Sequence, residues 1–154
     1  MRFFEKIIVF LLLLSVSCVS TRNSSKNQAK FSITLSSCYE NFNIKLQFND
    51  YEPYTLINVV SNESLGISNT FLEYHENSKK TYLVVTQNNV KDTLDINLDQ
   101  RFNLKVRLLE DGTDFKNHFS VNTRKGKIIF LDACVTDAKN FFNLMQYRRP
   151  VLLD

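Results

Sequence analysis

The sequence has no tryptophan, three glycines and two histidines among 154 residues, and these scarcities exclude several kinds of site. Gly66, Gly112 and Gly126 are too scattered to form a phosphate-binding loop. His75 and His118 belong to no HExxH motif, and the chain contains no CxxC pair, so neither zinc nor redox motifs are present. A GxSxG nucleophile motif is also missing. We therefore expect no metal and no cofactor.

Long apolar runs are missing as well. The longest, residues 7–14, is well short of the 18 or more residues that a membrane-spanning helix needs. It follows the basic residues Arg2 and Lys6 and ends in the small residues 15–17 directly before Cys18, which is the pattern of an export signal.

Residues 15–18 resemble the signal of bacterial lipoproteins, although Ser15 stands where that family usually has leucine. The resemblance implies that Cys18 is acylated on sulfur and becomes the first residue of the mature chain. Simple secretory cleavage at the same place is the alternative, and it would leave a soluble periplasmic or secreted protein. No acidic residue occurs at 19–23, so by resemblance to lipoprotein sorting rules the periplasmic leaflet of the outer membrane is the expected location.

The predicted organisation is a signal peptide at 1–17, a lipidated cysteine and flexible tether at 18–30, and a single domain at 31–154. Residues 19–30 are rich in Ser, Asn and Lys and contain too little apolar surface to order themselves. Without residues 1–17, which carry Arg2, Lys6 and Glu5, the net charge falls from +3 to +2. No long run of like charge occurs, so we expect no nucleic-acid partner.

Alternation of apolar and polar residues indicates β-strands throughout the domain. Apolar side chains occupy every second position at 42–48 and again at 102–108. Further candidate strands lie at 31–35, 54–60, 69–75, 81–86, 93–98, 119–123, 127–133 and 141–147. Short strands at this spacing, separated by polar turns such as Asn88-Asn89, predict an all-β fold, an antiparallel β-sandwich of roughly 7–10 strands.

Two segments leave alternatives open. Residues 99–101 are either a turn or the middle of one long bent strand, because the alternation continues on both sides. Residues 136–146 fit a helix capped by Thr136 or Asp137, but they also alternate, and we favour a terminal hairpin. The C-terminal half, with 119–133 running through a Lys-Gly-Lys turn, is similar to transthyretin-type or immunoglobulin-like sandwich domains of exported bacterial proteins, a similarity that implies the architecture and no site.

Four residues remain as candidates for a structural or binding role. Cys38 and Cys134 can form a disulfide in an exported protein, although small buried thiols are also common in sheets. Tyr51 and Tyr54 flank Pro53 on a predicted loop, where they would suit either a protein or glycan partner or the capping of the open end of the sandwich.

Three functions are consistent with these features. The first is a non-enzymatic, lipid-anchored binding or scaffolding module of the cell envelope, held at the membrane by its N-terminal anchor. The second is an immunity or inhibitor lipoprotein that blocks an incoming toxin or hydrolase, for which we expect charge or aromatics concentrated on one surface. The third is an envelope enzyme whose site is assembled from distant strands and therefore leaves no local motif.

Overall fold

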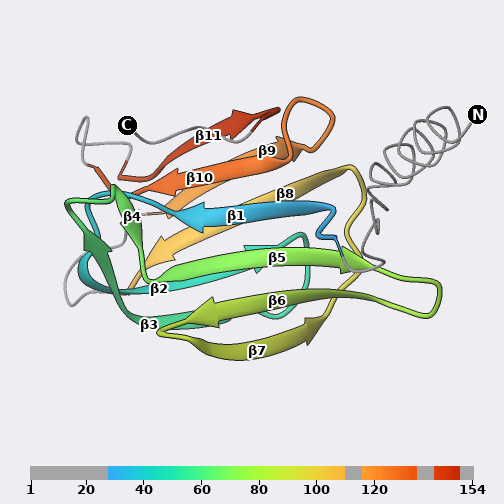
Figure 1. Ribbon diagram of the computed structural model, residues 1–154, viewed down its shortest axis with the longest axis horizontal. Helices are drawn as coiled ribbons and strands as arrows, with labels where there is room; N and C mark the ends of the chain where they lie inside the picture. The colour runs from blue at the N-terminus through green and yellow to red at the C-terminus, as the bar shows by residue number, and fades with distance from the viewer. Residues whose placement is uncertain (1–27, 110–115, 135–140, 150–154) are drawn as a thin grey trace, which may run out of the picture.

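The computed structural model describes residues 28–109, 116–134 and 141–149, and the regular structure in these ranges is β-strand (Figure 1). The strands in chain order are β1 (Phe31–Leu35), β2 (Glu40–Phe48), β3 (Tyr54–Asn62), β4 (Ile67–Ser68), β5 (Thr70–Glu76), β6 (Thr81–Gln87), β7 (Val90–Asp95), β8 (Arg101–Leu108), β9 (Lys116–Asn122), β10 (Ile128–Asp132) and β11 (Asn143–Tyr147). In these three ranges no helix is long and apolar enough to cross a membrane.

The strands form two sheets. The six-stranded sheet has the order β11-β10-β1-β5-β6-β7, and the five-stranded sheet has the order β4-β3-β2-β8-β9. Hydrogen bonds join the sheets along both sides: the Gln87 side chain of β6 donates to the Ile57 carbonyl of β3 at 2.8 Å, and the Gln146 side chain of β11 donates to the Asn122 carbonyl of β9 at 3.2 Å. The two layers therefore face each other with β3 near β6 and β9 near β11.

Apolar side chains from the inner faces of both sheets fill the space between them. Phe31 of β1 stacks on Tyr74 of β5 with ring centroids 5.0 Å apart, and it also stacks on Phe102 of the opposite sheet at 5.2 Å. Phe48 of β2 lies beside Phe102 at 6.0 Å. These aromatic contacts connect the layers and add to the stabilisation from burying apolar area.

The all-β sandwich expected from the sequence is confirmed, with two differences in detail. The two-residue strand β4 brings the number of strands in the described residues to eleven, above the expected 7–10. In addition, β1 pairs in parallel with β10 on one side and antiparallel with β5 on the other, so the six-stranded sheet is mixed (Figure 1). A parallel pair needs a long connection, and here the chain runs through both sheets before it returns to β1.

The two open alternatives are resolved for the described residues. Strand β7 ends at Asp95 in one sheet and β8 begins at Arg101 in the other, so residues 96–100 cross between the layers. The strand predicted at 93–98 therefore lies earlier in the chain than expected, at Val90–Asp95. Ile96 and Leu98 are buried during this crossing, which explains why the alternation continues. Residues 143–147 pair antiparallel with β10 and form the favoured hairpin, whereas residues 135–140 lie outside the described residues.

The β2–β3 pair contains two irregularities that the alternation of apolar and polar residues did not predict. Asn41 in β2 and Asn58 in β3 have positive φ, at 65° and 55°, and the pairing register shifts beside each of them. Asparagine tolerates this conformation better than most residues. The extra residue at Asn58 lets Leu56 and Val59, three positions apart, both point into the core.

Candidate functional site

The outer face of the five-stranded sheet carries a concentration of basic side chains. Residues at 44, 46 and 48 in β2 and at 102, 104, 106 and 108 in β8 are buried in the core. Because side chains alternate along a strand, Lys45 in β2 and Lys105 and Arg107 in β8 are directed to the opposite face. Lys116 and His118 of β9 continue the same exposed face.

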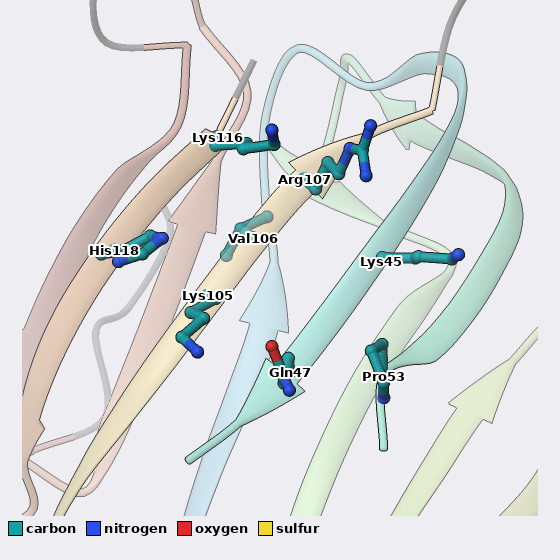
Figure 2. Close-up of a pocket in the computed structure, with 8 residues that line it drawn as sticks. All are labelled: Lys45, Gln47, Pro53, Lys105, Val106, Arg107, Lys116 and His118. Carbon is teal, nitrogen blue, oxygen red and sulfur yellow. The ribbon is translucent and has the colours of Figure 1, made fainter. Parts of the chain in front are cut away.

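The strand register places these side chains in two rows across the sheet. In one row Lys45 pairs with Arg107, and Arg107 pairs with Lys116. In the next row Lys105 lies between Gln47 and His118. With Pro53 at its side, this arrangement borders a groove of about 250 Å³, which we call the cationic groove (Figure 2).

The electrostatics of the groove differ from those of the other sheet. Like charges directly opposite each other on neighbouring strands are destabilising, by roughly 0.2–1 kcal/mol per pair. Arg107 and Lys116 have contacts of their own. The side chains of Lys45 and Lys105, by contrast, make no ion pair or hydrogen bond with the described residues.

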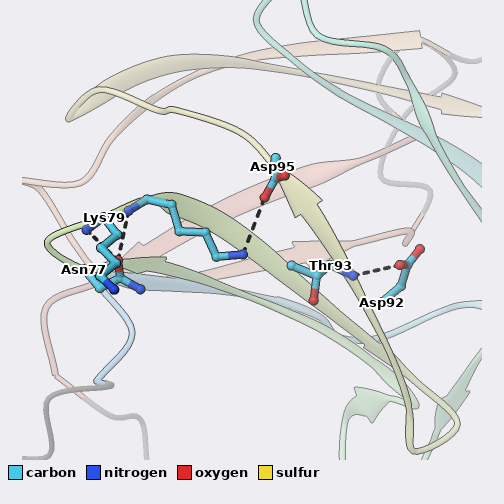
Figure 3. A network of polar contacts seen from close by, with 6 residues as sticks. Asn77, Lys79, Asp92, Thr93 and Asp95 are labelled. Carbon is cyan, nitrogen blue, oxygen red and sulfur yellow. Dashed lines mark hydrogen bonds and ion pairs between the residues drawn. The ribbon is translucent and has the colours of Figure 1, made fainter.

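Two cations of the six-stranded sheet region are matched by carboxylates. Lys30 lies 3.2 Å from the Glu76 carboxylate, and Lys80 lies 3.8 Å from that of Asp95 on β7. Figure 3 shows this second region, where the Asn77 side chain also accepts hydrogen bonds from backbone N–H groups of the β5–β6 turn. Other lysines of this region form no ion pair with the described residues, so what distinguishes the cationic groove is that its lining gathers four basic side chains and, among the described residues, contains no carboxylate.

Tyr51 lies in the β2–β3 connection, which contributes Pro53 to the groove, and Tyr54 is the first residue of β3. The Tyr51 ring is 38% exposed, and its hydroxyl donates to the Asn97 carbonyl at 3.2 Å and accepts from the Asn97 N–H at 3.0 Å. The half-buried Tyr54 donates its hydroxyl to Asp92 at 3.0 Å. Burial, and secondly this hydrogen bond, raise the pKa of Tyr54. Both phenols thus fasten the connection to neighbouring segments, and a partner-binding role for them remains a prediction.

The remaining candidates are placed as follows. A disulfide links Cys38 to Cys134 across a sequence separation of 96 residues. His75 stacks on Tyr82 in the six-stranded sheet, and His118 lies within β9. Cys18 and the signal peptide lie outside the described residues. Within those residues, no three His, Cys, Asp or Glu side chains are grouped to hold a metal ion.

Sequence reasoning did not find the cationic groove because it searched for runs of like charge. The signal that was available is the set of basic residues on the polar phase of two predicted strands: Lys45 in the strand at 42–48, and Lys105 with Arg107 in the strand at 102–108. Only the pairing of these strands, and the extension of β9 back to Lys116, bring the charges together.

Comparison with protein-family models, with curated proteins and with solved structures finds no match to this chain. The groove's own chemistry must therefore indicate what it binds.

Proposed function

We propose that this protein is an exported, lipid-anchored and non-enzymatic binding module of the cell envelope, and that it holds an anionic partner in the cationic groove. The observation that carries the proposal is the meeting of Lys45, Lys105, Arg107 and Lys116 on one face of the five-stranded sheet. In this proposal the export signal and the acylated Cys18 direct the protein to the envelope membrane, and residues 19–30 form the tether.

The chemistry of the groove favours carboxylate-bearing ligands of extended shape. Cations from three adjacent strands present a surface on which an acidic protein segment can place several carboxylates at once. Such complementarity raises association rates and excludes partners of the wrong charge.

The same observation supports a second candidate function, an immunity or inhibitor lipoprotein. A protein that blocks a toxin or hydrolase needs one concentrated surface complementary to its target, and the cationic groove is such a surface for a target with an acidic rim. Both functions require an acidic protein partner. They differ in whether binding inhibits that partner's activity.

Reversing the charge of the two unmatched lysines tests the groove. In the full chain purified from the envelope in detergent, Lys45→Glu with Lys105→Glu is expected to weaken binding of a short poly-glutamate peptide at least tenfold, which corresponds to about 1.4 kcal/mol. Isothermal titration calorimetry at two salt concentrations measures the effect, and the wild-type affinity should fall as salt rises.

The matched control is Lys79→Glu with Lys91→Glu, which changes the net charge equally with two exposed lysines of the six-stranded sheet region. This variant should bind the peptide as the wild type does. Equal losses in the two double variants would show that only net charge matters, and would contradict a specific role for the groove.

The anchor is tested separately. Cys18→Ser is expected to move the protein from the detergent phase to the aqueous phase and to abolish incorporation of radiolabelled lipid, because sulfur is the acylated atom in the proposed signal. The circular dichroism spectrum of the variant should stay β-dominated. Membrane association that survives the substitution would contradict the lipoprotein assignment and indicate an uncleaved signal.

A further inference from the structure

A second cavity lies on the outer face of the six-stranded sheet, where β1 ends. It has a volume of about 160 Å³ and is bordered by residues that follow β1, by Gly66 in the turn before β4, and by side chains of β10 and β11. The cationic groove occupies the outer face of the other sheet, so the two sites are independent. We call this cavity the Asp132 pocket.

An unpartnered hydroxyl group forms part of the pocket. Ser36 is 4% exposed, and its Oγ has no hydrogen-bond partner among the described residues. Ser36 follows Leu35, which pairs with Leu131, so it lies beside Asp132 on the neighbouring strand. A buried hydroxyl without a partner is costly, and most such groups in folded proteins are satisfied. The Ser36 hydroxyl is therefore available to a ligand in the pocket.

The carboxylate of Asp132 lacks a cation. It makes no ion pair with the described residues, and the contact to its Oδ1 is a long one, from the Ser37 N–H at 3.4 Å. Burial raises the pKa of Asp132, and the Ser37 N–H offsets this only in part. The fold thus keeps a carboxylate in a place that disfavours its ionised form.

The wall of the pocket next to this polar end is apolar and aromatic. Phe130 and Tyr147 meet edge to face with ring centroids 5.6 Å apart. Met145 is the direct strand partner of Phe130, and the Tyr147 hydroxyl donates only to its sulfur, at 3.4 Å. Sulfur is a weak acceptor. Aromatic rings and a thioether provide contacts for an aliphatic stem, and the rings also attract a cation.

The polar rim of the pocket is held rigidly. The Ser61 hydroxyl donates to the Ser36 carbonyl at 2.7 Å and accepts from the Tyr39 N–H at 2.9 Å. The buried Tyr39 hydroxyl donates to the Leu131 carbonyl at 2.7 Å. The Cys38–Cys134 disulfide joins the segment that follows β1 to the segment that follows β10. A rim fixed in this way loses little entropy when a ligand binds.

We propose that the Asp132 pocket binds a primary ammonium group carried on an aliphatic stem. The ammonium pairs with the Asp132 carboxylate and donates a hydrogen bond to Ser36 Oγ, while the stem lies against Phe130, Met145 and Tyr147. A lysine side chain of a partner protein and a small alkylamine are the two sources of this chemistry.

The test uses pentylamine and acetyl-lysine amide as probes, titrated into the full chain and followed by calorimetry. Pentylamine should bind with a millimolar dissociation constant, and 1-pentanol, of equal length but neutral, at least tenfold more weakly. Tighter binding of acetyl-lysine amide than of pentylamine identifies a protein partner as the source, and the reverse identifies a small amine. Pentanol binding as tightly as pentylamine, or displacement of pentylamine by methyl glucoside, would overturn the proposal.

Substitutions locate the binding. Asp132→Asn should weaken pentylamine binding at least tenfold, and Ser36→Ala should weaken it severalfold, whereas Asp50→Asn, which removes an exposed carboxylate elsewhere, should have no effect. Unchanged affinity in Asp132→Asn would overturn the proposal. Binding to poly-glutamate should be the same in all three variants, so failure here is distinguishable from failure of the cationic groove.

A stability measurement checks that Asp132→Asn remains folded. Because the folded state raises the pKa of Asp132, ionising this group costs stability as pH rises from the unfolded pKa through the folded one. The asparagine variant should therefore have a higher Tm than the wild type at pH 7, and the difference should vanish near pH 3. Among the described residues, the other ionisable side chains at or near the pocket, Tyr39 and Tyr147, are phenols. A lower Tm for the variant at pH 7 would contradict the desolvated carboxylate on which the site depends.

Discussion

Leu46→Asp or Val106→Asp is expected to unfold the domain. The two side chains are direct cross-strand partners in β2 and β8, and neither is more than 1% exposed. A carboxylate introduced there has no cation in reach and costs several kcal/mol, against a total stability of roughly 5–15 kcal/mol for a domain of this size. Circular dichroism and urea denaturation of each variant should show loss of the cooperative transition.

The neighbouring pair of positions provides the control. Lys45 and Arg107 are also direct partners in the same two strands, one register position away and on the outer face. Lys45→Asp and Arg107→Asp should therefore leave the transition in place. Equal damage from the inner and outer pairs would mean that the sheet is buried on both faces, which is incompatible with an open cationic groove.

The period of two predicted the strands well where one face is buried and the other solvated. It was correct at 42–48 and 102–108 because burial alternates strictly over 44–48 and over 102–108. It misplaced β7, for which 93–98 was predicted and Val90–Asp95 is observed. Ile96 and Leu98 are buried where the chain crosses between the sheets. Alternating apolar and polar residues therefore indicate that every second side chain is buried, but they do not show that the segment belongs to a sheet.

Other features depend on contacts between distant residues, which no local pattern contains. The parallel pairing of β1 with β10 brings Leu35 next to Leu131, and it alone places Ser36 beside Asp132. Positive φ at Asn41 and Asn58 changes the register of β2 and β3 without any change in composition. Both candidate sites are formed by residues that only the pairing of distant strands brings together. For this reason the sequence predicted an exported β-domain but did not predict where its candidate binding sites lie.

Removing the disulfide is expected to have the second large effect. Cys38→Ser with Cys134→Ser opens a loop with a sequence separation of 96 residues, and in the chain-entropy model a loop of that size contributes about 4 kcal/mol. The free energy of unfolding, measured by urea denaturation, should fall by roughly that amount. The wild type in reductant should match the double variant.

The position of the disulfide makes a more specific result possible. Cys38 follows Ser36 and Ser37, and Cys134 follows Asp132 by two residues, so the bridge joins the two polar edges of the Asp132 pocket. Its loss should therefore weaken pentylamine binding while leaving poly-glutamate binding at the cationic groove unchanged, under conditions where the variant is still folded. A stability loss below about 1 kcal/mol would contradict the entropic role of the bridge. Equal losses at both sites would show that the variant is loosened throughout and that the bridge has no particular relation to the pocket.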